Sequence, residues 1–180
     1  MNIKNLLIPF LLIAIVFSVD AQTKKQKKKM KEASKAVKEA KRQLLEKDST
    51  MQLLFTSSYG YLLIPKVGKG GFGVGGAGGY GVAYEGKKKV GYAKLSQLSI
   101  GFQAGGQSYR EVVFFENADA MERFKGNKVE LSAQVSAVAA ASGASADAKY
   151  VDGVVVITDT IGGLMYEASV GGQKFEFFAK

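Results

Sequence analysis

The sequence has 180 residues, of which 47% are hydrophobic and 23% charged, so it is long and apolar enough for one globular domain with its own core. It contains no His and no Cys, which excludes disulfides, Cys/His zinc sites and His-dependent nucleophilic catalysis. Its formal net charge is +9, and what this implies depends on where along the chain the charge lies.

Residues 1–21 are typical of a secretory signal peptide. Lys4 supplies a short basic region, an apolar run follows, and Val19 and Ala21 occupy the two positions that a signal peptidase reads. We expect cleavage before Gln22 and export to the periplasm or the outer-membrane periphery of a bacterial cell envelope. An uncleaved signal anchor is the alternative, because a dense run of lysines follows at once and resists translocation.

Residues 22–47 form a basic arm that carries nearly all of the net charge. The arm holds eleven Lys and Arg against three Glu, whereas residues 48–180 hold thirteen Lys and Arg against twelve Asp and Glu. Apolar residues recur with the spacing of one helix face at Met30, Ala33, Val37, Ala40, Leu44, Met51 and Leu54. This pattern predicts an amphipathic helix, which either docks its thin apolar stripe onto the domain or lies on an anionic membrane surface.

Residues 60–86 are rich in glycine. The G-x-G-x-x-G pattern occurs there in three overlapping registers, without the helix and acidic residue that a dinucleotide site needs, so we attribute it to composition. Every second residue from 71 to 83 is Gly or Ala, which predicts β-structure with one bare face. We expect a helix or a lipid chain to pack on that face, although residues 75–79 are equally consistent with a turn between two shorter strands.

The rest of the chain predicts a β-rich fold of seven to nine short strands. Strands are expected at 98–104, 112–115, 129–139, 154–158, 164–170 and 174–178, with a loop at 140–148. Leu98 and Ile100 alternate with polar residues, as in a half-buried strand. Asn117 is a favourable N-cap for a helix over 118–125 with Met121 and Phe124 inward. The predicted class is α+β: a curled, mostly antiparallel sheet with a basic N-terminal helix and a short helix near 118–125.

The acidic residues of the domain are scattered and form no catalytic constellation. We expect them to be solvated turn residues, and we expect no enzyme activity, no cofactor and no metal site. These carboxylates are Glu111, Glu116, Asp119, Glu122, Asp152, Asp159 and Glu167.

Several segments resemble the SYLF family of lipid-binding domains, in order and spacing, over about residues 30–178. They are 61–65 (YLLIP), 66–69 (KVGK), 72–76 (FGVGG), 81–82 (GV), 100–106 (IGFQAGG), 112–115 (VVFF), 162–165 (GGLM) and 171–172 (GG). The resemblance implies a β-rich domain with helices packed on it, and binding of anionic membrane lipids by a basic, amphipathic N-terminal part. Some eukaryotic members are also described as actin-binding.

The sequence thus predicts a signal peptide (1–21), a basic amphipathic helical arm (22–47) and a SYLF-like β-rich domain (48–180). We expect a stand-alone, exported bacterial member that binds anionic lipids or a membrane surface, and neither nucleic acid nor actin. The candidate lipid-binding residues are Lys24, Lys25, Lys27, Lys28, Lys29, Lys31, Lys35, Lys38, Lys41, Arg42, Lys66, Lys69, Lys87, Lys88 and Lys89. The alternatives are a small outer-membrane β-barrel, or an envelope adaptor protein that binds another protein or an anionic polymer.

The signal-peptide interpretation makes one direct prediction. N-terminal sequencing of the protein purified from its own cell should start at Gln22. A protein that starts at Met1 would contradict cleaved export.

Overall fold

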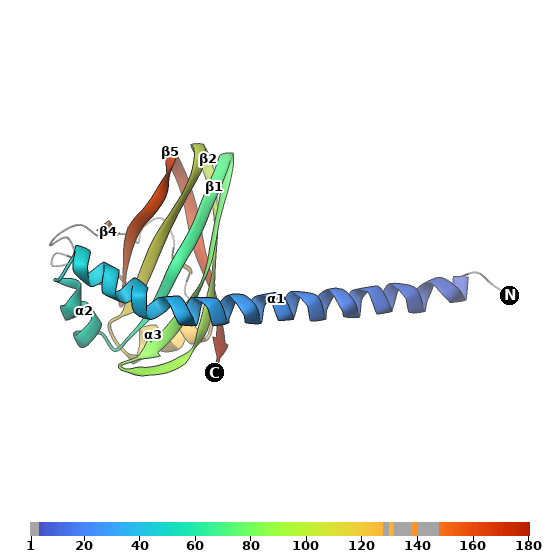
Figure 1. Ribbon diagram of the computed structural model, residues 1–180, viewed down its shortest axis with the longest axis horizontal. Helices are drawn as coiled ribbons and strands as arrows, with labels where there is room; N and C mark the ends of the chain where they lie inside the picture. The colour runs from blue at the N-terminus through green and yellow to red at the C-terminus, as the bar shows by residue number, and fades with distance from the viewer. Residues whose placement is uncertain (1–3, 128–129, 132–137, 140–147) are drawn as a thin grey trace.

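Three long antiparallel strands form the framework of the protein in a computed structural model (Figure 1). The structure describes residues 4–127, 130–131, 138–139 and 148–180. The elements, in chain order, are α1 (Lys4–Lys47), α2 (Met51–Ser57), β1 (Gly60–Glu85), β2 (Lys88–Phe115), α3 (Ala118–Lys125), β3 (Glu130–Leu131), β4 (Val138–Ala139) and β5 (Val154–Ala179). This confirms the α+β class with a curled, mostly antiparallel sheet.

The sheet has the order β1-β2-β5-β3, and β4 pairs with β5 in parallel. β1 and β2 form a hairpin around Gly86 and Lys87, paired from Glu85↔Lys88 to Gly60↔Phe115. β5 returns along the other side of β2, from Phe115↔Val154 to Gly91↔Ala179. β2 is therefore the central strand, hydrogen-bonded along both edges.

The prediction of seven to nine short strands was wrong. β1, β2 and β5 have 26, 28 and 26 residues, and β5 unites the three strands predicted at 154–158, 164–170 and 174–178. The glycines between the predicted strands bend each strand but do not end it. Gly73, Gly105 and Gly163 have φ values of 70°, 122° and 103°, which L side chains rarely adopt.

Because the long strands bend, the sheet wraps around one core cluster. Both halves of β1, β2 and β5 contribute to that cluster, and α3 closes it with Ala120, Met121 and Phe124. The strand residues of this inner core are Leu62, Ile64, Val67, Ala83, Ala93, Leu95, Tyr109, Val113, Phe115, Val154, Val156 and Phe175.

The helix α3 has the predicted bounds and orientation. The Asn117 side chain accepts a hydrogen bond of 3.0 Å from the backbone N–H of Ala120, and Met121 and Phe124 are buried. Of the strand predicted at 129–139, the structure describes β3 and β4. The rest of that range, and residues 140–147 of the predicted loop, lie outside the described residues.

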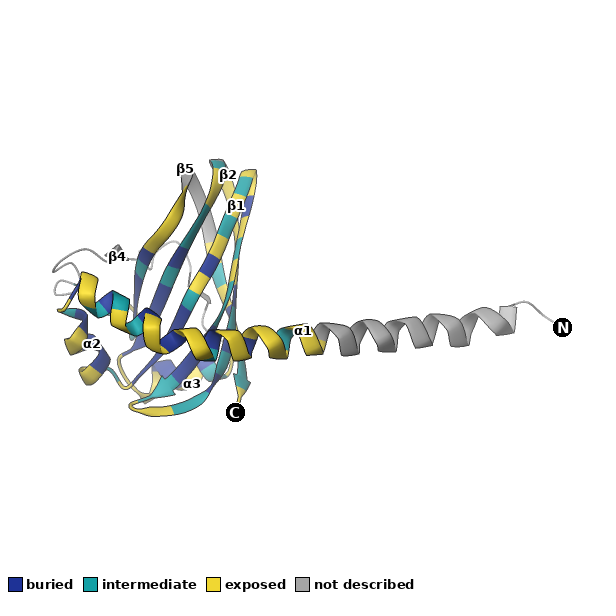
Figure 2. Cartoon of the chain, viewed as in Figure 1, coloured by how far each residue is buried: buried dark blue, intermediate teal, exposed yellow. Residues whose placement is uncertain are grey.

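A second cluster forms on the outer face of the sheet, where α1 and α2 dock. It joins Val37, Ala40 and Leu44 of α1 and Met51, Leu54 and Phe55 of α2 to strand residues such as Phe114. All seven residues of the predicted apolar stripe are at most 8% exposed. Figure 2 shows buried positions recurring along the part of α1 that runs beside the sheet. Of the two placements left open by the sequence, the structure therefore shows docking onto the domain.

In the part of the chain that the structure describes, no helix is both long enough and apolar enough to cross a membrane.

The bare face of the glycine-rich segment packs against the beginning of the same strand. A Cβ atom placed on Gly79 would lie 2.8 Å from Ile64 Cγ2 and 2.8 Å from the carbonyl oxygen of Lys66. The expected occupant, a helix or a lipid chain, was therefore wrong at this position. The second half of β1 crosses its own first half, and only a residue without a side chain fits the crossing.

The strand around residue 99 presents the opposite face from the one expected. Ser99 is buried at 1% exposure, whereas Leu98 and Ile100 are 64% and 62% exposed. The alternating pattern was read correctly as a strand, but its apolar side faces solvent. Register with β1, not local hydrophobicity, determines which side is inside, because Val74↔Ile100 and Gly76↔Leu98 are direct pairs.

The self-crossing of β1 predicts that Gly79→Val destabilises the fold. The new side chain would overpack against Ile64 and Lys66, so we expect the free energy of unfolding in urea to fall by about 1–3 kcal/mol. Gly78→Val is the matched control, since a Cβ there would lie 3.5 Å from the carbonyl oxygen of Leu95, an ordinary contact. Equal stability of the two variants would contradict the crossing.

Candidate functional site

A row of lysines runs along the face of α1 opposite its buried stripe. Lys24, Lys28, Lys31, Lys35 and Lys38 follow one another at intervals of three or four residues, and all are exposed. Lys25, Lys27 and Lys29 are also exposed, and Lys29, four residues before the buried Ala33, lies on the side of α1 that faces β1. Like charges at this spacing repel one another, so an anionic partner would stabilise this face.

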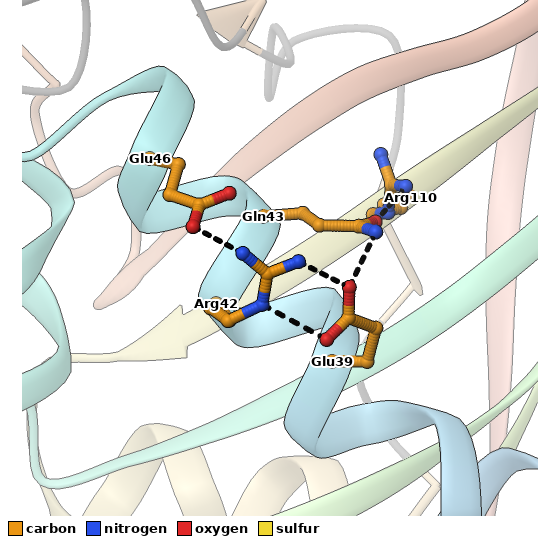
Figure 3. A network of polar contacts seen from close by, with 5 residues as sticks. All are labelled: Glu39, Arg42, Gln43, Glu46 and Arg110. Carbon is orange, nitrogen blue, oxygen red and sulfur yellow. Dashed lines mark hydrogen bonds and ion pairs between the residues drawn. The ribbon is translucent and has the colours of Figure 1, made fainter.

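The basic row ends where acidic residues neutralise it. Arg42 donates hydrogen bonds of 2.9 and 2.5 Å to the Glu39 carboxylate and is also paired with Glu46 (Figure 3). The hydrogen bonds from Arg42 lower the pKa of Glu39, and the hydrogen bonds to Glu39 in turn raise the pKa of Arg42. Arg42 was predicted as a lipid-binding residue, but its guanidinium is already engaged within the helix.

A partly buried network attaches the C-terminal end of α1 to the sheet. Asp159, which is 3% exposed, pairs with Arg110 and with Lys47 of α1. Arg110 also donates a hydrogen bond to Gln43, which donates one of 2.7 Å to Glu39 (Figure 3). The expectation that Asp159 is a solvated turn residue was therefore wrong, since it compensates two cations at a helix–sheet contact.

Two other candidates, Lys41 and Lys89, are occupied by contacts within the protein. The Lys41 ammonium lies 4.0 Å from the ring centre of Phe55, and burial lowers its pKa. Lys89 donates hydrogen bonds of 2.9 Å to Ser34 Oγ and 2.8 Å to the Tyr92 hydroxyl. These lysines hold the helices against the sheet, a role that the sequence pattern did not reveal.

The structure brings the helix and the glycine-rich strand together at a groove of about 580 Å³ between α1 and β1. Lys29 of α1 and Lys66 of β1 both line it, with Ala33, Tyr80 and Ile161 as part of its apolar wall. An adjoining groove of about 570 Å³ is lined by Lys66 and Lys69. Tyr80 and Ile161 were not among the predicted site residues, because nothing in the sequence relates them to the arm.

Lys87 and Lys88 stand apart from these grooves. Both are exposed, Lys87 in the β1–β2 turn and Lys88 at the first position of β2. Neither lines either groove. The predicted set thus divides into an exposed lysine face on α1, a groove pair at Lys66 and Lys69, a separate turn, and three residues engaged in internal contacts.

The carboxylates are divided among separate places: Asp119, Glu122 and Asp152 line a groove of about 510 Å³ beside α3, whereas Glu111 and Asp159 are buried in the sheet. Glu111 is fully buried, with one carboxylate oxygen accepting a hydrogen bond of 3.0 Å from Gln173. Burial raises its pKa to about 7. Glu111 follows Arg110, which pairs with Asp159, so Glu111 and Asp159 belong to opposite faces of the sheet. The described residues contain no group of three His, Cys, Asp or Glu side chains that could hold a metal ion.

The fold and this surface define a β-rich α+β domain that presents one face of a docked basic helix to its surroundings. Residues 96–176 of the chain match the family Ysc84, described as "Las17-binding protein actin regulator", which is a SYLF family. This confirms the resemblance noted in the sequence. The family is associated with lipid binding and, in related proteins, with actin regulation.

One curated relative adds to this resemblance. Over 133 residues the chain is 28% identical to Beta cell expansion factor A of Aeromonas veronii. The match covers 73% of this chain and 51% of that protein, so the chain spans about half the length of this relative.

The buried Glu111 predicts a pH-dependent stability. Between its ordinary pKa of 4.5 and about 7, the folded chain keeps the proton that the unfolded chain releases. The free energy of unfolding therefore falls as pH rises through this window, by up to ~3 kcal/mol. The Glu111→Gln variant should not show this pH dependence. As pH rises from 4.5 to 7, its free energy of unfolding in urea should therefore increase relative to that of the wild type. Parallel stability curves for the two proteins would contradict it.

Proposed function

We propose that the protein binds the anionic surface of a lipid membrane, without enzymatic activity, through the lysine row on α1. The observation that carries the proposal is the direction in which α1 is docked. Its apolar stripe is buried against the sheet, so the face left to solvent is the one that carries Lys24, Lys28, Lys31, Lys35 and Lys38.

The binding would be mainly electrostatic at this face. Each lysine near an anionic leaflet contributes about 1 kcal/mol, so the row of five contributes about 5 kcal/mol, a reversible attachment similar in strength to a single myristoyl chain. Because the stripe is occupied, the helix would rest on the headgroups and would not sink its apolar face among the acyl chains, as the sequence alone allowed. Salt should weaken the contact strongly.

The membrane would be that of a bacterial cell envelope, reached by export. This location rests on the signal-like segment 1–21. In that compartment phosphoinositides are scarce and actin is absent, so we propose anionic phospholipids in general as the partner and do not propose actin.

The proposal predicts that Lys31→Glu/Lys35→Glu weakens binding to vesicles of phosphatidylcholine and phosphatidylglycerol by at least about tenfold. Both residues are exposed, so the fold should be unchanged. Co-sedimentation at several salt concentrations measures the effect, with vesicles of phosphatidylcholine alone as the lipid control.

Two control variants distinguish this face from the rest of the surface. Lys149→Glu/Lys180→Glu makes the same change in net charge at exposed positions outside α1 and should bind nearly as the wild type. Lys89→Met removes a lysine with internal partners and should change stability more than binding. Equal binding to both kinds of vesicle, or equal losses in the two Lys→Glu pairs, would rule out the lysine row as the site.

A further inference from the structure

Four large apolar side chains are exposed together where the sheet bends. Phe72, Val74, Leu98 and Ile100 are 88%, 59%, 64% and 62% exposed. Phe72 and Val74 flank Gly73, where β1 bends, and Leu98 and Ile100 belong to β2. We call these four residues the bend patch. Single exposed apolar residues are ordinary, but a contiguous exposed group marks an interaction surface.

The pairing of β1 with β2 joins Val74, Leu98 and Ile100 into a continuous surface, and Phe72 lies two residues before Val74, across the bend at Gly73. Val74 and Ile100 are direct partners, and Leu98 lies two residues from Ile100 on the same face. The partner of Leu98 is Gly76, which has no side chain to cover it. Phe72 precedes Gly73, whose positive φ belongs to a register shift between Phe72 and Val74.

The stretches of β1 and β2 that hold the patch carry no charged residue. Neither residues 70–84 of β1 nor residues 95–109 of β2 include an Asp, Glu, Lys or Arg. These stretches are flanked by Lys69 and Glu85 on β1 and by Lys94 and Arg110 on β2. Of these four residues, Lys69 and Lys94 lie nearest to the bend patch along the sequence. An uncharged apolar surface bordered by lysines is suited to an anionic bilayer, where the apolar groups enter and the ammonium groups stay with the headgroups.

We propose that the bend patch enters the boundary between headgroups and acyl chains of an anionic lipid bilayer. The inference rests on the proposed membrane binding and names the part of the protein that penetrates, which the docked stripe of α1 does not do. A lipid surface fits better than a second copy of the chain, because two copies would bring their bordering lysines together. The buried Ser99 between Leu98 and Ile100 fits this role, since the strand turns its apolar side outward at this place.

The absence of tryptophan from the chain gives a direct test. Phe72→Trp places one indole in the patch, and Leu53→Trp places one on α2, at a position 70% exposed and outside the patch. Both variants are bound to phosphatidylcholine–phosphatidylglycerol vesicles with brominated acyl chains. We expect strong quenching of the indole in the Phe72→Trp variant and little in the Leu53→Trp variant, whereas equal quenching or none would overturn the inference.

A second variant measures what the patch contributes. Leu98→Ser/Ile100→Ser removes two exposed groups, so its melting temperature should equal that of the wild type. We expect about tenfold weaker vesicle binding. We also expect that the fraction of protein that stays bound to vesicles at high salt is lost.

The two experiments separate the proposals. If vesicles bind through the lysine row but the serine variant binds as the wild type, insertion is wrong and the proposed function stands. If no vesicles bind, both are wrong. If the wild type is a dimer that the serine variant dissociates, as measured by light scattering, the patch serves a second copy and the inference is overturned.

Discussion

The burial of one narrow apolar stripe determines how the rest of the molecule can act. An amphipathic helix has a single apolar face, and α1 packs that face against the sheet, where Val37, Ala40 and Leu44 join the outer cluster. The network of Lys47, Asp159 and Arg110 fixes the same helix at its C-terminal end. The lysines on the opposite face are therefore held in one orientation relative to the sheet, as part of the domain's surface and not as a free arm.

Glycine has two distinct effects in the strands. At Gly79 the missing side chain lets β1 cross its own beginning, so that a sheet of few strands encloses a core. At Gly73 a left-handed backbone accompanies the bend that leaves Phe72 and Val74 in solvent. The same composition therefore produces a tightly packed region and an exposed apolar region within one strand. The two kinds of exposed surface therefore lie on different elements: the charged surface on α1, and the apolar surface at the bend.

Local patterns predicted what local forces control. The cap at Asn117, the bounds of α3 and the stripe of α1 follow from short-range spacing and were confirmed. Strand continuity and facing were not predictable, because glycine pairs read as turns and because Ser99 is placed inside by its register with β1. Candidate site residues were assigned by charge alone, whereas Lys41, Arg42 and Lys89 are engaged by partners distant in sequence or along the same helix. Only the folded structure reveals these contacts.

The position of β2 between its two neighbours has a consequence for how the chain reaches this structure. The β1–β2 hairpin closes from a two-residue turn and can pair progressively outward. β5 has no such start, since its first pair with β2 joins Phe115 to Val154 and its last joins Gly91 to Ala179. Such long-range pairing is slow. Until residues 154–179 are available, that edge of the central strand stays unpaired, and an exposed strand edge of this length is prone to misassociation.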